Sequence, residues 1–276
     1  MDGASLDGEV LAAVAGRLTA VDGVVGVTRA GGRPRDDHHP DSDVELGLYY
    51  RAPLDVGALG VVARDVYGPG AEVSAPGEWG PWVDGGAWLR VKGVALDWTY
   101  RDLDRVRSAW EGAQRGVFAF HAEVGHPFGV PDFAYAGELA LAVVLADPTG
   151  ELAALKDEFQ EYPPALRRAL ADCLGEAVLL VEVALKAVPR RDTTYVAGCL
   201  FRAFTLCAHA IHGHAGHWLV DEKGAITAAD RLPGAPEGFS ARAHGILSAL
   251  GMAAEPLEVA VDSGLVLVRD VIKRLR

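Results

Sequence analysis

Residues 24–50 read VVGVTRAGGRPRDDHHPDSDVELGLYY, and the order of segments within this stretch indicates the fold. The β-branched run over 24–28 predicts a strand, and the polar stretch over 31–42 predicts a loop. From Asp43 to Tyr50 the chain then alternates polar and apolar side chains, as a half-buried strand does. We therefore expect two strands joined by a polar loop that begins with glycine.

Asp43 and Glu45 open the second of these strands. Because side chains two positions apart share one face of a strand, the two carboxylates are expected about 7 Å apart along that face. Such a pair can bind hard divalent cations such as Mg²⁺, which prefer carboxylate oxygen and leave coordination sites for water and phosphate. A third acid, Asp97, lies in the apolar run VALDW, where a carboxylate is costly unless it binds a metal or another partner.

Gly31 and Gly32 begin the polar loop. Glycine has no side chain, so backbone N–H groups at this point can approach phosphate oxygens. Taken alone, a glycine pair is more often a turn, and an Asp-x-Glu pair is more often the solvated face of a strand. The order of glycine pair, acid pair and later acid favours the phosphate and metal interpretation.

The glycine pair, the run SDVEL over 42–46 and Asp97 together resemble the signature of the DNA polymerase β-like nucleotidyltransferase superfamily. Within it, the resemblance is to the small-molecule or antibiotic branch, of aminoglycoside or lincosamide type. The usual motif is Gly-Ser, a loop, and then Ser-Asp-x-Asp or Ser-Asp-x-Glu. Gly32 stands where serine is common, so only backbone amides remain there for phosphate. The resemblance is specific over about residues 24–100 and architectural beyond residue 150.

The resemblance implies an enzyme of the EC 2.7.7 type. It would transfer a nucleoside monophosphate from an NTP such as ATP to a hydroxyl of a small acceptor and release pyrophosphate. Asp43 and Glu45 would bridge two Mg²⁺ ions and the triphosphate. Asp97 would hold the ion on the nucleophile side and accept the hydroxyl proton.

The resemblance also assigns the remaining site residues. Gly31 and Gly32 would cradle the β- and γ-phosphates, with Ser42 as a second contact. In related enzymes a glutamate of the helical half acts as the base instead of the third acid. Glu138 is the candidate for that role here, and a surface glutamate of a helix is the ordinary alternative.

The acceptor suggested first is an aminoglycoside- or lincosamide-like antibiotic, which would make the chain an antibiotic-resistance protein. Two other interpretations stay open. One is a protein-modifying nucleotidyltransferase of the toxin–antitoxin type. The other is a degenerate nucleotide-binding module without turnover, which Gly32 suggests.

The hydrophobic pattern changes near Pro131 and predicts two domains. Before it, we expect strands over 87–92, 94–100 and 117–121, and helices over 6–18, 56–67 and 103–114. Beyond it, helices are expected over 135–145, 164–187, 195–211, 240–250 and 256–275. We therefore predict an α+β chain, with a mixed α/β nucleotidyltransferase domain over 1–128 and an all-helical bundle domain over 129–276. The Gly- and Pro-rich stretch 125–131 marks the boundary.

The composition limits the kinds of partner that the chain is expected to bind. The chain has 276 residues, 38 of them acidic and 26 basic, and a formal net charge of −12. This balance argues against a nucleic-acid partner, because phosphate backbones are bound by clusters of Lys and Arg. The opening MDGASLDGEV has no basic segment followed by a long apolar one, and three sparse cysteines suit a reducing compartment. We expect a cytoplasmic protein with no signal peptide and no membrane partner, and leave a homodimer open.

Two further clusters invite interpretation. Four tryptophans fall within 20 residues, and they either frame an acceptor pocket or fill the core, as aromatic strand residues usually do. These are Trp79, Trp82, Trp88 and Trp98. The histidine-rich run HAIHGHAGH over 209–217 suggests zinc, but its spacing matches no firm zinc pattern. A helix that ends at Gly213, with histidines near the terminal carbonyls, is the more ordinary explanation.

Overall fold

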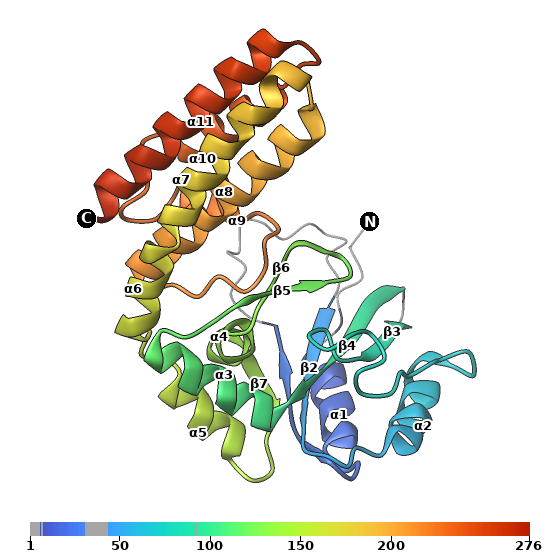
Figure 1. Ribbon diagram of the computed structural model, residues 1–276. Coiled ribbons are helices and arrows are strands. Elements are labelled where there is room, and N and C mark those ends of the chain that lie inside the picture. The colour runs from blue at the N-terminus through green and yellow to red at the C-terminus, as the bar shows by residue number, and fades with distance from the viewer. Residues whose placement is uncertain (1–5, 7, 31–43, 92) are drawn as a thin grey trace. The chain divides into compact units, whose positions relative to one another are not determined.

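The computed structural model describes residues 6, 8–30, 44–91 and 93–276. The chain divides into two compact units, which we describe separately. The N-terminal unit comprises Met1–Glu111 and Ala119–Glu161, and the helical unit comprises Gly112–Phe118 and Tyr162–Arg276. The fold is α+β, with a mixed sheet in the first unit and a helical C-terminal region, as the sequence predicted (Figure 1).

A five-stranded sheet forms the centre of the N-terminal unit, in the order β3-β4-β2-β1-β7. β2 and β4 run parallel, and the other neighbouring pairs run antiparallel. The strands are β1 (Val24–Arg29), β2 (Val44–Tyr50), β3 (Gly86–Val91), β4 (Val94–Asp102) and β7 (Val143–Ala146). The four strands predicted over 24–28, 43–50, 87–92 and 94–100 are thus confirmed and form one continuous part of the sheet.

Two helices, α1 (Gly8–Leu18) and α2 (Val56–Tyr67), pack against one face of this sheet (Figure 1). Leu46 and Leu48 of β2 point to that face and are fully buried, as is Trp98 of β4. Successive side chains of a strand point to opposite faces. Glu45 and Asp97 therefore lie on the other face of the sheet, away from this core.

The predicted helix over 135–145 is wrong in its second half. Helix α4 (Ala134–Leu141) ends before Ala142, and β7 then pairs antiparallel with β1. The apolar run VVLA of β7 fits a short buried strand as well as a buried helix, so periodicity alone could not separate them. The segment forms a strand rather than a helix because the backbone N–H and C=O groups at the open edge of β1 need hydrogen-bond partners.

The stretch predicted to mark the domain boundary belongs to a hairpin. β5 (Phe120–Glu123) pairs antiparallel with β6 (His126–Pro131), and α5 (Glu151–Glu158) follows β7. With α3 (Leu103–Arg115), these elements complete the regular structure described before Tyr162. The compact units divide at Glu161 and Tyr162 rather than at residue 128, because β7 joins the sheet of the first unit and β6, α4 and α5 belong to that unit.

Every regular element described after Tyr162 is a helix. The elements are α6 (Pro164–Asp172), α7 (Leu174–Ala184), the 3₁₀ segment η2 (Leu185–Arg190), α8 (Thr193–Ala215), α9 (Ala225–Ala229), α10 (Phe239–Ser248) and α11 (Ala254–Leu275). α6, α7 and α11 all pack on α8, which is the core helix of this unit. The predicted helix over 164–187 is broken at Cys173, and the helices predicted further along are confirmed within a few residues.

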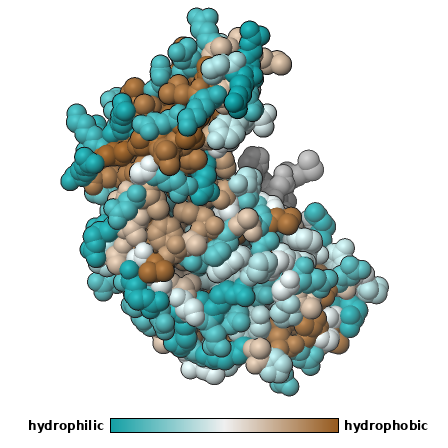
Figure 2. Space-filling model, in the orientation of Figure 1, coloured by the Kyte–Doolittle hydropathy of each residue, from teal (hydrophilic) through white to brown (hydrophobic). Residues whose placement is uncertain are grey.

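Among the described residues, α8 alone is long and apolar enough to cross a membrane. Most of its apolar window, 67%, is buried inside the structure, which is typical of the core helix of a soluble domain. In Figure 2, hydrophobic residues also gather on the surface of the helical unit. Its exposed large apolar side chains include Leu179, Val259 and Val266.

The histidine-rich run lies inside and just after α8. The helix continues past Gly213 to Ala215, and Gly216 caps it in the left-handed conformation with φ 71°, so the predicted end at Gly213 is wrong. His209 and His212 are buried. Burial lowers the pKa of His209 to about 3, and burial together with the nearby His217 lowers the pKa of His212 to about 4. Both imidazoles are therefore neutral near pH 7.

We expect the free energy of unfolding to fall as the pH decreases from about 6.5 to about 4. In this range the unfolded chain binds protons on both imidazoles, whereas the buried ones stay neutral, so stability rises with pH. Urea unfolding followed by helical circular dichroism, at about pH 7.5 and about pH 5, measures the loss.

Two variants test the origin of this loss. His209→Gln removes one buried titrating group and should reduce the difference in stability between the two pH values. His244→Gln, at an exposed position of α10, should leave that difference unchanged. An equal difference in both variants and the wild type would contradict the assignment to the buried histidines.

Candidate functional site

Glu45 and Asp97 are direct partners across the parallel strands β2 and β4. Glu45 is exposed and Asp97 is half-buried, while Leu46 and Leu96 next to them are fully buried on the core face. Neighbouring strands lie about 4.8 Å apart, so the two carboxylates can reach one divalent cation. The sheet thus brings together two predicted site residues that lie far apart in the sequence.

The other predicted site residues, Gly31, Gly32, Ser42 and Asp43, lie outside the described residues. The described chain on either side of them meets beside Glu45. The backbone N–H of Ala30 donates to the carbonyl oxygen of Glu45 at 2.9 Å, and Arg29 pairs with Leu46. The end of β1, from which the glycine pair follows, is therefore adjacent to the start of β2.

Close packing continues along the same face beyond the acids. Gly47 follows Glu45 on this face, and a Cβ there would lie 2.9 Å from Oγ1 of Thr28 and 3.2 Å from the ring of Tyr49. Thr28 and Tyr49 are both buried. A side chain at position 47 would displace one of them, so glycine is required by this packing.

Further along β4, Arg101 forms a buried ion pair with Glu138 of α4. The guanidinium donates to both carboxylate oxygens, with 2.9 Å between Nη2 and Oε1, and the two side chains are 12% and 31% exposed. Nη1 of Arg101 also donates to the carbonyl of Tyr100 at 2.7 Å. Burial alone would lower the pKa of Arg101, but attraction to Glu138 and the hydrogen bonds between them raise it above its ordinary value.

This contact defines the role of Glu138. Both of its carboxylate oxygens accept hydrogen bonds from the Arg101 guanidinium, so both are engaged in a charge-assisted ion pair. Arg101 lies on the same strand face as Asp97, two side chains further along. The geometry therefore favours a structural role for Glu138, as the ion-pair partner of Arg101.

The four clustered tryptophans separate into different environments. Trp98 is fully buried in the core. Trp82 stacks on His121 with 3.7 Å between ring centroids. Trp79 and Trp88 stack on each other at 4.2 Å with an interplanar angle of 12°, and Trp88 is 70% exposed. The core interpretation is thus confirmed for Trp98, whereas Trp88 is exposed and an acceptor pocket at the other rings stays a prediction.

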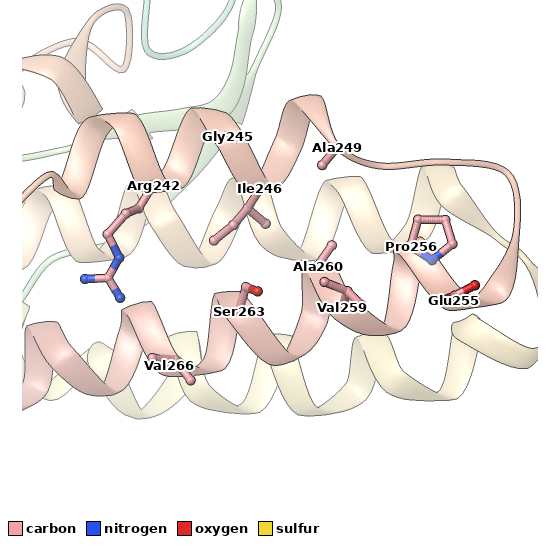
Figure 3. Close-up of a pocket in the computed structure, with 10 residues that line it drawn as sticks. All are labelled: Arg242, Gly245, Ile246, Ala249, Glu255, Pro256, Val259, Ala260, Ser263 and Val266. Carbon is pink, nitrogen blue, oxygen red and sulfur yellow. The ribbon is translucent and has the colours of Figure 1, made fainter.

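A groove of about 790 Å³ lies in the helical unit between α10 and α11 (Figure 3). Small and apolar side chains such as Ala249, Ile246 and Val259 line it, with Arg242 toward one end and Glu255 at the other. Neither Glu45 nor Asp97 is among its lining residues. The groove is therefore separate from the predicted acids.

No protein-family model matches the chain, and no curated protein matches it. A similar solved structure is that of a nucleotidyltransferase-like protein from Exiguobacterium sibiricum 255-15. It is 12% identical, with a TM-score of 0.43, and the alignment covers 92% of this chain and 70% of that chain. A likeness at this level assigns no activity, so the function of this chain has to be inferred from its own residues.

We expect Glu138→Gln to lower the free energy of unfolding by roughly 3 kcal/mol, because the charge of Arg101 then stays buried without its partner. Urea unfolding at neutral pH measures the change. The double variant Arg101→Met, Glu138→Leu should be more stable than Glu138→Gln, since it removes both charges. Glu72→Gln, at an exposed position of the same unit, serves as the control and should stay within about 0.5 kcal/mol of the wild type. A Glu138→Gln protein that is as stable as the wild type would contradict the structural role of Glu138.

Proposed function

We propose that the chain is a metal-dependent nucleotidyltransferase that moves a nucleoside monophosphate from an NTP to a hydroxyl of a small acceptor. The observation that carries the proposal is the register that pairs Glu45 with Asp97. It supports a shared cation site on the face of the sheet opposite α1 and α2. Asp43 comes two residues before Glu45 and is proposed as the third carboxylate.

The donor set fits Mg²⁺, because carboxylate oxygens are the hard ligands that this ion prefers. Bound Mg²⁺ would neutralise charge on the triphosphate and acidify the acceptor hydroxyl. Asp43 and Glu45 would hold the two ions, and Asp97 would be a further ligand of the ion on the acceptor side. In the transfer, the acceptor oxygen bonds to the α-phosphorus while the bond to the pyrophosphate oxygen breaks. The hydroxyl proton passes to Asp97.

Gly31, Gly32 and Ser42 are proposed to position the β- and γ-phosphates, the glycines through backbone N–H groups and the serine through its hydroxyl. The end of β1 beside Glu45 supports this role, because the glycine pair follows that strand directly. Phosphates held there would lie on the β1 side of the acids.

The acceptor is proposed to be a small hydroxyl compound, and aminoglycoside- and lincosamide-like antibiotics are the first class to test. A formal net charge of −12 supports a cationic acceptor over an anionic one. We propose a cytoplasmic location, and α8 as a buried core helix is consistent with it.

Two substitutions test the proposal. We expect Glu45→Gln and Asp97→Asn each to lower pyrophosphate release by about 100-fold or more, because each removes a charged cation ligand. The assay mixes the full chain with Mg²⁺, labelled NTPs and a panel of antibiotic and cell-extract acceptors, and Glu72→Gln is the matched acid-to-amide control. Full turnover in both site variants would contradict the assignment.

Two other outcomes of the same assay would indicate a different function. NTP binding by the wild type with no pyrophosphate released would indicate a nucleotide-binding module instead. Transfer to a protein acceptor would indicate the protein-modifying class.

Metal binding gives a readout that does not depend on turnover. We expect Mn²⁺, measured by water-proton relaxation with an unreactive ATP analogue present, to bind the wild type and to bind Asp97→Asn at least about tenfold more weakly, since one charged ligand is lost. Glu72→Gln should bind Mn²⁺ as the wild type does. Equal affinity in all three proteins would remove Asp97 from the cation site.

A further inference from the structure

The order of the strands indicates on which side of the proposed site the phosphates and the acceptor would bind. Across the sheet, β1 leads to the glycine pair, β2 carries Glu45, β4 carries Asp97, and β3 comes last. If the phosphates lie at the β1 side, then the acceptor approaches from the β3 side, beyond Asp97. This step rests on the proposed function. It directs attention to the side chains of β3.

Trp88 is the residue of β3 that lies next to the acids. It pairs with Asp97 across the antiparallel strands β3 and β4. Its neighbours Ala87 and Leu89 are buried on the core face, so Trp88 projects from the same face as Asp97 and Glu45. The side chain is 70% exposed although it stacks on Trp79, so one face of its ring remains open.

The turn that carries Trp79 is anchored by Asp84, whose side chain is buried. Trp79 donates its backbone N–H to the carbonyl oxygen of Asp84 at 3.2 Å. The Asp84 side chain is 3% exposed and accepts hydrogen bonds from the hydroxyl of Tyr50 at 2.9 Å and from the N–H of Gly77 at 2.8 Å. Asp84 also has φ 71°, which residues other than glycine rarely adopt. These contacts fix the turn that carries Trp79, and Trp79 in turn orients Trp88.

We propose that Trp88, supported by Trp79, is a platform on which the acceptor stacks a flat aromatic ring while its hydroxyl points to Asp97. Paired residues of antiparallel strands have Cα atoms about 4.5–5.5 Å apart. This short spacing suits an acceptor whose reacting hydroxyl is attached to the stacked ring directly or through about one carbon. The acceptor class is a phenol or an aromatic alcohol, which narrows the small hydroxyl acceptor of the proposed function to aromatic compounds, in place of the saturated rings of aminoglycoside- and lincosamide-like antibiotics. A saturated ring of the same size presents no π-face and gains less from the platform.

A matched pair of probes tests the platform. 2-Naphthol and decahydro-2-naphthol carry one hydroxyl on fused rings of similar size, but only the first is aromatic. Ligand-observed NMR titrations of the full chain, with Mg²⁺ and an unreactive ATP analogue, give the two dissociation constants. We expect 2-naphthol to bind at least about fivefold more tightly, the lower end of the stacking effect on an aromatic side chain.

Three variants test whether Trp88 is the source of the preference for 2-naphthol. Trp88→Ala should remove the preference for 2-naphthol, and Trp88→Phe should keep part of it. Tyr67→Ala removes another exposed aromatic ring of the same unit, in α2 on the opposite side of the sheet, and should keep all of it. Equal binding of the two probes, or an unchanged preference in Trp88→Ala, would overturn the platform. If instead Trp88→Ala weakens binding of the ATP analogue as much as it weakens binding of 2-naphthol, the ring that stacks on Trp88 is the nucleobase and the acceptor assignment is wrong.

Pyrophosphate release separates failure of the platform from failure of the proposed function. Turnover that depends on Glu45 and Asp97 but does not favour aromatic acceptors would overturn the platform and leave the function standing. Binding of 2-naphthol through Trp88, with no pyrophosphate released from any NTP, would overturn the function and leave an aromatic binding site. Where both hold, Trp88→Ala should raise the KM for 2-naphthol about fivefold or more and change kcat little.

Discussion

The parallel register of β2 and β4 is the constraint on which the rest of the N-terminal unit depends. It directs Leu46 and Trp98 into the core beneath α1 and α2, and it sets Glu45 beside Asp97 on the opposite face. A slip of one residue would move each side chain of one strand to the other face. The same register therefore specifies both the hydrophobic core and the pair of carboxylates.

The sequence predicts what depends on local pattern. Alternation identified β2, and helical spacing identified α1 and α2, because these signals arise within one element. β7 was missed because four apolar residues have no distinctive period, and only the exposed edge of β1 makes them a strand. The first compact unit extends beyond residue 128 for the same reason, since β7 pairs with β1 of its sheet.

The candidate site likewise has features that the sequence predicts and features that only the structure shows. Glu45 and Asp97 were predicted by residue type and by resemblance to a known motif, and the sheet adds that they are direct neighbours. The ion pair of Arg101 with Glu138 could not be predicted, because no periodicity links a strand residue to a helix residue that follows much later. Likewise, the sequence groups the tryptophans but does not distinguish Trp98 in the core from Trp88 at the surface. That distinction follows from the pairing of β3 with β4.

The anchored turn at Asp84 has an evolutionary consequence. It connects Tyr50, at the end of β2, to the segment that presents Trp79, without passing through either carboxylate of the site. Substitutions at the two stacked rings can therefore accumulate while the acids stay as they are. With the roles proposed above, a lineage of such proteins could diverge in the molecules that it recognises and retain one reaction, because Trp88 and Trp79 lie on β3 and a turn, whereas Glu45 and Asp97 lie on β2 and β4.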